Sequence, residues 1–249
     1  MEKTCGCIGC EIVKVKDLIR NAIWNSGAQG LVIGISGGID SAVAGALAVK
    51  AVGKERVIGV FMPASEHGMQ DLDDAQTLCD FLGVELLIVS LEKVLAEFLR
   101  TPHITATPIA AGNISARLRM TVLYNIAASR DYLVCGTSNK TEYLVGYSTK
   151  WGDGAADIQP LLHLYKKDVY AIARELELPA RIIQKAPTAG FFPGQTDEED
   201  LGMSYAELDD ALFTLELNNY VPTTEFEGKI LEMMKKSEHK RHLPASKFR

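Results

Sequence analysis

The stretch Ser36-Gly37-Gly38-Ile39-Asp40-Ser41 follows the apolar run Leu31–Ile35 and precedes an alanine- and valine-rich run that favours a helix. A buried strand, a glycine-rich turn and a helix N-terminus in this order form an anion-binding loop. Backbone N–H groups point outward there, and the helix dipole favours negative charge. Gly37 and Gly38 allow the backbone to approach a phosphate closely. Asp40 adds a carboxylate that can hold a divalent metal ion.

The stretch differs from a Walker-type phosphate loop. A Walker loop carries a lysine that reaches the β- and γ-phosphates, and no lysine occurs between Ser36 and Ser41. The alternative interpretation is a simple glycine turn that closes a βαβ unit, with the serines as helix caps. The full pattern of serines, glycines and aspartate between a strand and a helix favours the phosphate-binding loop.

Apolar runs alternate with helix-like segments over the first half of the chain. The expected strands are Leu31–Ser36, Val57–Met62, Leu86–Ser90 and Tyr132–Cys135. The expected helices are Val13–Trp24, Ser41–Val52, Gln70–Leu82, Asn113–Ser129, Ser204–Leu217 and Thr224–Lys236. This alternation predicts an α/β fold, a doubly wound, mostly parallel sheet flanked by helices, with a helical C-terminal extension. Ligands of such sheets bind at the carboxyl ends of the strands, where the Ser36–Ser41 loop lies.

Two parts of the chain lack this periodicity. Thr188–Gly202 is polar, rich in acidic residues and glycine, and is expected to form an irregular loop. The N-terminus carries cysteines and is expected to be a tail over residues 1–12. No repeat or linker divides the sequence, so a single domain is expected over residues 1–249.

The composition excludes several classes of protein. The chain has 249 residues, 47% of them hydrophobic, and a net charge of −6. This acidic balance argues against broad binding of nucleic acid. No apolar run approaches the roughly 18 residues of a membrane helix. A signal peptide is not evident either, so the expected location is the cytoplasm and no membrane partner is expected.

The cysteines fall into two groups. Cys79 and Cys135 lie in apolar segments and are expected to pack as small hydrophobic residues. Cys5, Cys7 and Cys10 crowd the N-terminus. They could hold zinc or an iron–sulfur cluster if a fourth ligand came from elsewhere. The alternative is a loosely held terminus whose thiols have no essential role.

Polar residues follow the last predicted strand. Gly136 and Glu142 lie just beyond Tyr132–Cys135, and Glu142 could complete a Mg²⁺ site with Asp40. A surface turn is the alternative for this segment. Lys150 and Lys166 are candidate phosphate contacts, although any single lysine is more often a solvated surface residue.

Further blocks match a family pattern together with the Ser36–Ser41 stretch. They are Gly112–Met120, Gly136-Thr137 with Glu142, Gly152-Asp153-Gly154-Ala155-Ala156-Asp157, Lys185–Ala189, Gly194–Glu198 and Glu238-His239-Lys240-Arg241. With these blocks, from about Val13 to Phe248, the chain resembles the ammonia-dependent NAD⁺ synthetases of the N-type ATP pyrophosphatase (PP-loop) superfamily. The resemblance implies an adenine nucleotide alpha hydrolase-like fold and a homodimer. The cluster Cys5–Cys10 is not part of the family pattern.

The resemblance also implies a reaction. ATP would adenylate the nicotinate carboxylate of deamido-NAD⁺, and ammonia would then displace AMP from the acyl-adenylate to give NAD⁺. Mg²⁺ is the implied metal, and ATP is a co-substrate. The sequence contains no glutaminase segment, so free ammonia or a separate protein would supply the nitrogen.

The resemblance assigns roles to individual positions. The residues expected to bind ATP are Ser36, Gly37, Gly38, Ile39, Asp40, Ser41, Thr137, Lys166 and Thr188. Those expected to bind deamido-NAD⁺ are Arg117, Lys150, Asp157, His239 and Lys240. Asp40 and Glu142 would hold Mg²⁺. The expected catalytic residues are Asp40, Lys166 and Asp157, the last as the group that orients or deprotonates ammonium.

Three other functions fit parts of the sequence. A PP-loop enzyme that adenylates and thiolates a tRNA base would use the N-terminal cysteines, but no RNA-binding module is evident. A nucleotide-binding regulatory protein would leave the metal carboxylates without a purpose. An electron-transfer protein would depend on only three clustered thiols, Cys5, Cys7 and Cys10.

Overall fold

A four-stranded parallel sheet forms the centre of the molecule. The computed structural model describes residues 7–65, 67–105, 107–188 and 194–243. The strands are β1 Gly30–Gly34, β2 Val57–Phe61, β3 Glu85–Ile88 and β4 Tyr132–Cys135. Their order in the sheet is β3-β2-β1-β4, and each neighbouring pair is parallel. All four strands predicted from apolar runs are confirmed; β4 has the predicted ends, and the ends of the other three differ by at most two residues.

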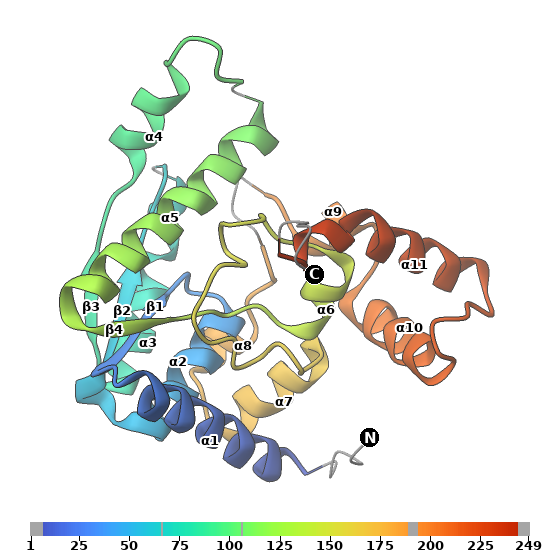
Figure 1. Cartoon of the computed structure of the whole chain (residues 1–249), viewed down its shortest axis with the longest axis horizontal. Helices are drawn as coiled ribbons and strands as arrows, with labels where there is room; N and C mark the ends of the chain where they lie inside the picture. The colour runs from blue at the N-terminus through green and yellow to red at the C-terminus, as the bar shows by residue number, and fades with distance from the viewer. Residues whose placement is uncertain (1–6, 66, 106, 189–193, 244–249) are drawn as a thin grey trace.

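Helices surround the sheet and extend beyond it (Figure 1). They are α1 Ile8–Ser26, α2 Ile39–Val52, α3 Leu72–Leu82, α4 Glu92–Leu99, α5 Pro108–Arg130, α6 Lys140–Val145, α7 Lys166–Glu175, α8 Ala180–Ile183, α9 Asp197–Leu201, α10 Tyr205–Leu217 and α11 Glu225–Ser237. Short 3₁₀ turns lie at Lys54–Arg56, His67–Asp71 and Glu238–Lys240. Within the described residues, every helix is too short or too polar to cross a bilayer.

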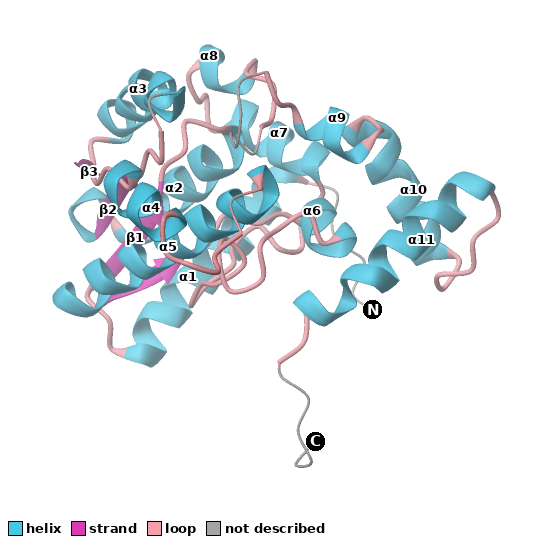
Figure 2. Cartoon of the chain, turned by 90° about the horizontal axis from the view of Figure 1, so that it is seen from above, coloured by secondary structure: helices cyan, strands magenta, loops and turns pink. Residues whose placement is uncertain are grey.

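The two faces of the sheet bury alternate residues of the same strands. Leu31 and Ile33 of β1 pack with α1, α2, α3 and α7 in one apolar cluster. Val32, between them, packs on the opposite face with Ile58 and with residues of α5. Because both faces are covered, these strands are apolar along their whole length, which is why they could be found in the sequence. Figure 2 shows the helices on either side of the strands.

The C-terminal helices build a second, smaller core. Leu208, Leu212 and Leu215 of α10 pack against Ile230 of α11 and Val145 of α6. The start of α10 is fixed by the predicted capping box, in which the Ser204 hydroxyl and the Glu207 carboxylate each accept from the other's backbone N–H. The predicted helical C-terminal extension is therefore confirmed, and it packs through α6 beside the end of β4.

The structure corrects two predictions. α1 begins at Ile8, so Ile8–Ile12 belong to a helix and not to the predicted tail 1–12, of which residues 1–6, Cys5 included, lie outside the described part. Thr188–Gly202 is not irregular throughout, because α9 occupies Asp197–Leu201 after a Thr196 cap. The second error comes from a short polar helix that its cap rather than apolar periodicity defines, whereas α1 starts at Cys7 without a side-chain cap that would mark its first turn in the sequence. Ala189, in one of the matched blocks, lies outside the described residues.

Candidate active site

The Ser36–Ser41 loop leads from β1 into α2, with Gly38 as the N-cap of the helix. The Ser41 Oγ donates to the Gly38 carbonyl at 2.9 Å and accepts from the Ser36 N–H at 3.3 Å. The Gly38 N–H donates to the Ser36 Oγ at 3.2 Å. These bonds fix the turn, and the first amides of α2, which have no intrahelical acceptor, remain directed out of the helix end. The loop therefore has the preformed geometry of an anion site.

Lys185 and two aspartates enclose this loop. The Lys185 ammonium donates to Asp71 Oδ1 at 2.6 Å and to Asp74 Oδ2 at 2.7 Å. Gly37 has φ of 77°, and a Cβ there would lie 3.0 Å from the Asp74 Cβ and 3.4 Å from the Lys185 Nζ. Only glycine fits this backbone conformation and this space. Lys185 belongs to one of the matched blocks, but the sequence analysis assigned it no individual role.

Lys166 opens α7, and its ammonium lies between two carboxylates. The Nζ donates to Asp40 Oδ2 at 2.6 Å and to Glu142 Oε1 at 3.1 Å. Its side chain is only 2% exposed. Asp40 comes from the first turn of α2 and Glu142 from α6, so three helices far apart in sequence meet at one point beside the carboxyl ends of β1 and β4. We call these three residues the charged cluster.

The charged cluster shifts the ionisation of its members. Burial alone would lower the pKa of Lys166, but the negative charges of Asp40 and Glu142 raise it above its ordinary value. Burial raises the pKa of Glu142 to about 7, with Lys166 opposing and Asp40 adding to the rise. The lysine therefore keeps its proton, and Glu142 takes one up more readily than an exposed glutamate.

Two side chains that the sequence did not reveal orient the carboxylates of the charged cluster. The Asn139 Nδ2 donates to Asp40 Oδ1 at 2.9 Å. The Tyr205 hydroxyl lies 3.1 Å from Glu142 Oε1 and 3.0 Å from Asp197 Oδ2. Asn139 could have been found as the N-cap of α6, since its side chain accepts from the Glu142 N–H. Tyr205 carries no such signal, because the apolar pattern of α10 marks it as a core residue.

The structure brings together four of the residues predicted to bind the dinucleotide. The Arg117 guanidinium donates to the Lys150 carbonyl at 3.2 Å, and the Lys150 ammonium donates to the His239 carbonyl. The Lys240 ammonium donates to two carbonyls of the loop after α6, at 2.8 and 2.7 Å. We call Arg117, Lys150, His239 and Lys240 the basic cluster. It joins α5, the loop after α6 and the 3₁₀ turn after α11.

The remaining predicted residues lie outside these two clusters. Asp157 lies along the edge strand β4, where its carboxylate accepts from the Val134 N–H at 2.8 Å and from the Tyr124 hydroxyl at 3.4 Å. Neither partner belongs to the charged cluster. Thr137 is half-buried in the turn between β4 and α6, and Thr188 is exposed after α8. The structure does not test the predicted ATP-binding roles of Thr137 and Thr188, which remain predictions.

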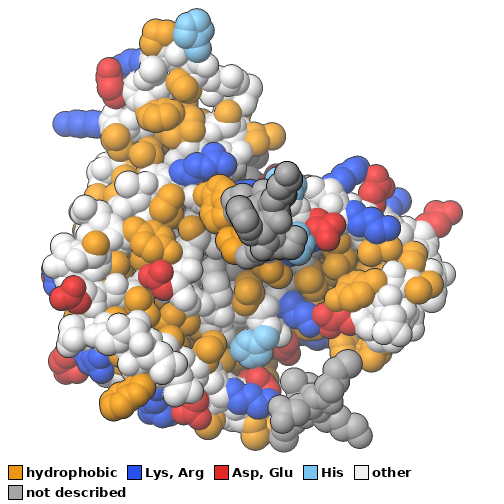
Figure 3. Space-filling model, in the orientation of Figure 1, with side chains coloured by type: hydrophobic (Ala, Val, Ile, Leu, Met, Phe, Trp, Pro, Cys, Tyr) orange, Lys and Arg blue, Asp and Glu red, His pale blue; other side chains and the backbone are white. Residues whose placement is uncertain are grey.

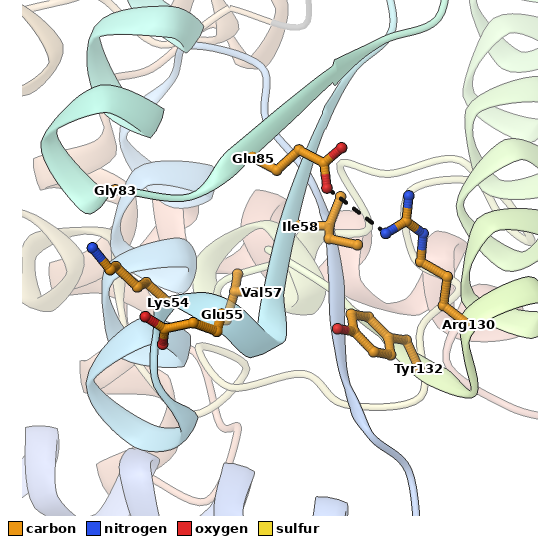
Figure 4. Close-up of a pocket in the computed structure, with 8 residues that line it drawn as sticks. All are labelled: Lys54, Glu55, Val57, Ile58, Gly83, Glu85, Arg130 and Tyr132. Atoms are coloured by element: carbon orange, nitrogen blue, oxygen red, sulfur yellow. Dashed lines mark ion pairs between the residues drawn. The ribbon is translucent and has the colours of Figure 1, made fainter.

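A shallow pocket of about 250 Å³ lies elsewhere on the molecule (Figure 4). It is lined by residues at the amino ends of β2, β3 and β4, among them Glu85 and Tyr132. The Arg130 guanidinium and the Glu85 carboxylate face each other across it, 3.7 Å apart. Because ligands of parallel sheets bind at the opposite, carboxyl edge, this pocket is not the candidate site.

Comparisons with known proteins identify the family of the chain. A family model described as NAD synthase matches residues 11–244. A protein of Methanoregula boonei named NH(3)-dependent NAD(+) synthetase is 49% identical over 235 residues, 94% of each chain. A solved structure of NMN synthetase from Francisella tularensis has a TM-score of 0.86 and 36% identity, covering 96% of this chain and 98% of that one. An NH3-dependent NAD synthetase from Campylobacter jejuni, in complex with nitrate, has a TM-score of 0.84 and 33% identity, with the same coverage.

We expect Lys166→Met to destabilise the protein, because it leaves two partly buried carboxylates facing each other without a cation. Removal of one partner from such a group costs about 3–5 kcal/mol. The free energy of unfolding in urea, without nucleotide or metal, measures the loss. The double variant Lys166→Met/Glu142→Gln removes a charge from the facing pair and should recover part of the stability. Equal stabilities of the single and double variants would contradict this account.

Proposed function

The chain belongs to the NAD synthase family, and from this premise we infer that it catalyses the ATP-dependent amidation of deamido-NAD⁺ with ammonia. The products are NAD⁺, AMP and pyrophosphate. The observation that carries the proposal is the preformed phosphate loop with the charged cluster at the start of the same helix, because it combines an anion site with a buried ammonium and two carboxylates. This combination suits a reaction in which charge develops on phosphate oxygens.

The chemistry explains why no side-chain nucleophile is needed. A carboxylate is a poor acyl donor because oxide is a poor leaving group. An oxygen of the nicotinate carboxylate attacks the α-phosphorus of ATP, and pyrophosphate leaves. Ammonia then attacks the carbonyl carbon of the acyl-adenylate, AMP leaves, and one proton is lost from nitrogen. The protein has to align the two substrates, stabilise charge on the phosphates and accept that proton.

We assign ATP binding to the phosphate loop and the residues around it. They are Ser36, Gly37, Gly38, Ile39, Asp40, Ser41, Thr137, Lys166 and Thr188. The support is strongest for the loop, whose helix-end amides favour negative charge, and for Lys166, which is buried and keeps its proton. The ammonium of Lys166 is thus placed to stabilise charge on the phosphates. Thr137 and Thr188 are assigned from the family pattern alone.

The donor set of Asp40 and Glu142 fits Mg²⁺. Both carboxylates direct an oxygen at one point, now taken by the Lys166 ammonium. No group of three or more metal-ligating side chains occurs in the described part of the chain. Mg²⁺ typically takes one or two carboxylates, with phosphate oxygens and water completing its shell, so two residues suffice. When bound, the ion would neutralise charge on the phosphate oxygens.

We assign deamido-NAD⁺ to the basic cluster and to Asp157. Arg117, Lys150, His239 and Lys240 lie together, and the positive charges of the arginine and the two lysines suit the two phosphates of a dinucleotide. Asp157 has two protein donors on its carboxylate, and the family pattern assigns it to deamido-NAD⁺. Its role in orienting or deprotonating ammonium rests on the need for a carboxylate that can accept a proton near the attacking nitrogen. It lies beside β4, the strand whose carboxyl end leads to Glu142, and is held there by the Val134 N–H.

A homodimer is supported by an apolar arm. α4 and the start of α5 project from the body of the molecule (Figure 1). The arm exposes Val94, Phe98, Ile104 and Ile109, the last at 73%, and Figure 3 shows apolar side chains along it. Such contiguous apolar surface is typical of protein interfaces. We therefore assign this arm to contacts with a second copy of the chain.

We treat residues 1–249 as one functional unit in the cytoplasm. The charged cluster is contacted by Tyr205 of α10, so the C-terminal helices contribute to the site formed by the sheet. Cys79 and Cys135 are free thiols in the buried core, which fits a reducing compartment.

Nicotinate mononucleotide is the competing substrate. The similarity to an NMN synthetase, at a TM-score of 0.86, favours it as a second candidate. The relatives named NAD synthetase reach a higher identity, 49%, which favours the dinucleotide. A tRNA-modifying enzyme is not supported, since the family match spans residues 11–244.

The decisive experiment measures pyrophosphate release from ATP and Mg²⁺ with ammonium and either deamido-NAD⁺ or nicotinate mononucleotide. We expect release that depends on the dinucleotide and yields equal amounts of AMP and NAD⁺. Asp40→Ala removes a metal carboxylate beside the phosphate loop and should lower kcat by at least about 100-fold. Release with the mononucleotide alone would establish the competing substrate, and no release with either would refute the proposal.

We expect Asp157→Asn to weaken catalysis chiefly at low pH, since ammonium must lose a proton before it attacks. The loss in kcat/KM for ammonium should be about 10²–10⁴-fold near neutrality. It should shrink above the pKa of ammonium, where free ammonia predominates. The measurement is the pH profile of kcat/KM for wild type and variant. A loss of the same size at every pH would assign Asp157 to binding or structure instead.

We expect the wild-type chain to sediment as a dimer and Ile109→Asp to shift it towards monomer, because a buried unpaired charge opposes association. Val221→Asp is the matched control, since Val221 is also exposed, at 63%, but lies outside the arm. Analytical ultracentrifugation distinguishes the two. A monomeric wild type, or equal effects of both variants, would contradict the assignment of the arm.

A further inference from the structure

Cys7 and Cys10 lie across the first turn of α1. Cys7 is the N-cap of the helix, and the Cys10 N–H donates to its carbonyl at 2.9 Å. The two cysteines therefore form a Cys-x-x-Cys pair whose first thiol lies at a helix N-terminus. The family match begins only at residue 11, so the proposed function gives this pair no role.

The surroundings of the pair suit a reactive thiol. Cys7 is exposed and Cys10 is half-buried. Polar contacts with the backbone and thiol of Cys10 lower the pKa of the Cys7 thiol, although the charge of Glu175 opposes them. A hypothetical Cβ on Gly9 would lie 3.7 Å from the Cys7 sulfur, so the glycine leaves that side open.

The other described cysteines provide an internal contrast. Cys79 and Cys135 are 0% and 1% exposed, in the apolar core of the sheet. Burial raises the pKa of each thiol to about 12. Thiolates are the reactive form of cysteine, so the accessible and polarised sulfur among these four is that of Cys7.

We propose that Cys7 and Cys10 are a dithiol site that exchanges with low-molecular-weight disulfides, with Cys7 as the attacking thiol and Cys10 as the resolving thiol. The exposed position of Cys7 at the helix N-cap, the Cys-x-x-Cys spacing, and the bond from the Cys10 N–H to the Cys7 carbonyl, which places both residues on one helical turn, together carry this assignment. It does not depend on the proposed synthetase activity.

The exchange balances in two steps. The Cys7 thiolate attacks one sulfur of R–S–S–R, forming a Cys7–S–S–R mixed disulfide and releasing RS⁻, which takes a proton from solvent. The Cys10 thiol then loses its proton and attacks the Cys7 sulfur. This forms the Cys7–Cys10 disulfide and releases a second RS⁻. The dithiol is oxidised by two electrons, and the small disulfide is reduced to two thiols.

The test uses the full chain, fully reduced and free of metal, with oxidised glutathione as the probe. Remaining thiols are alkylated after set times, and peptide mass spectrometry locates each modification. Wild type should give a Cys7–Cys10 disulfide. Cys10→Ser should stop at glutathione attached to Cys7. Cys7→Ser should react at least about 10-fold more slowly, and serine keeps the helix cap intact.

Controls separate this site from its alternatives. Cys5→Ser should react as the wild type does, and Cys79 and Cys135 should stay reduced. A disulfide that includes Cys5, or a Cys10→Ser variant that behaves as the wild type, would overturn the proposal. Protection of Cys5, Cys7 and Cys10 by one equivalent of Zn²⁺ at micromolar concentration would also overturn it, in favour of a metal site.

Discussion

The contact of the Lys166 ammonium with Asp40 and Glu142 is the constraint on which the site depends. A buried carboxylate pair repels itself, and a buried ammonium alone is costly, so each charge is tolerated only with the others. Because the three residues begin or lie in α7, α2 and α6, the contact also fixes how these helices meet at the end of the sheet. Tyr205 extends the same network to α10.

The same network determines which contacts must change when ATP binds. The charges of Lys166, Asp40 and Glu142 already pair with one another. Bound phosphates and a metal ion would therefore replace these pairs with new ones. Such an exchange is favourable only if the incoming charges balance, because an uncompensated charge in this buried place is expensive. Phosphate alone would add its full negative charge beside Asp40 and Glu142, whereas Mg²⁺ would offset part of that charge. The cluster thus favours the metal complex of the nucleotide over the free nucleotide.

The sequence revealed the sheet and the phosphate loop because both are local patterns. Strands buried on both faces appear as apolar runs, and a loop between a strand and a helix keeps its glycines and serines adjacent. Contacts between segments that are distant in the sequence could not be predicted from such local patterns. Tyr205 reaches Glu142 only because α10 packs on α6, and its place in an apolar pattern suggested a core residue. The short helices α8 and α9 contain four and five residues, too few to show an apolar period.

Residues assigned to the dinucleotide also hold the loop that carries them. The Lys240 ammonium donates to the carbonyls of Gly146 and Ser148, and the Lys150 ammonium to that of His239. Gly146 has φ of 71°, and a Cβ there would clash with Ser237, so the loop and the end of α11 are in close contact. Truncation of either lysine would therefore loosen the loop as well as remove a charge. An effect on stability without substrate would measure the first role, and only the additional loss in substrate affinity would measure the second.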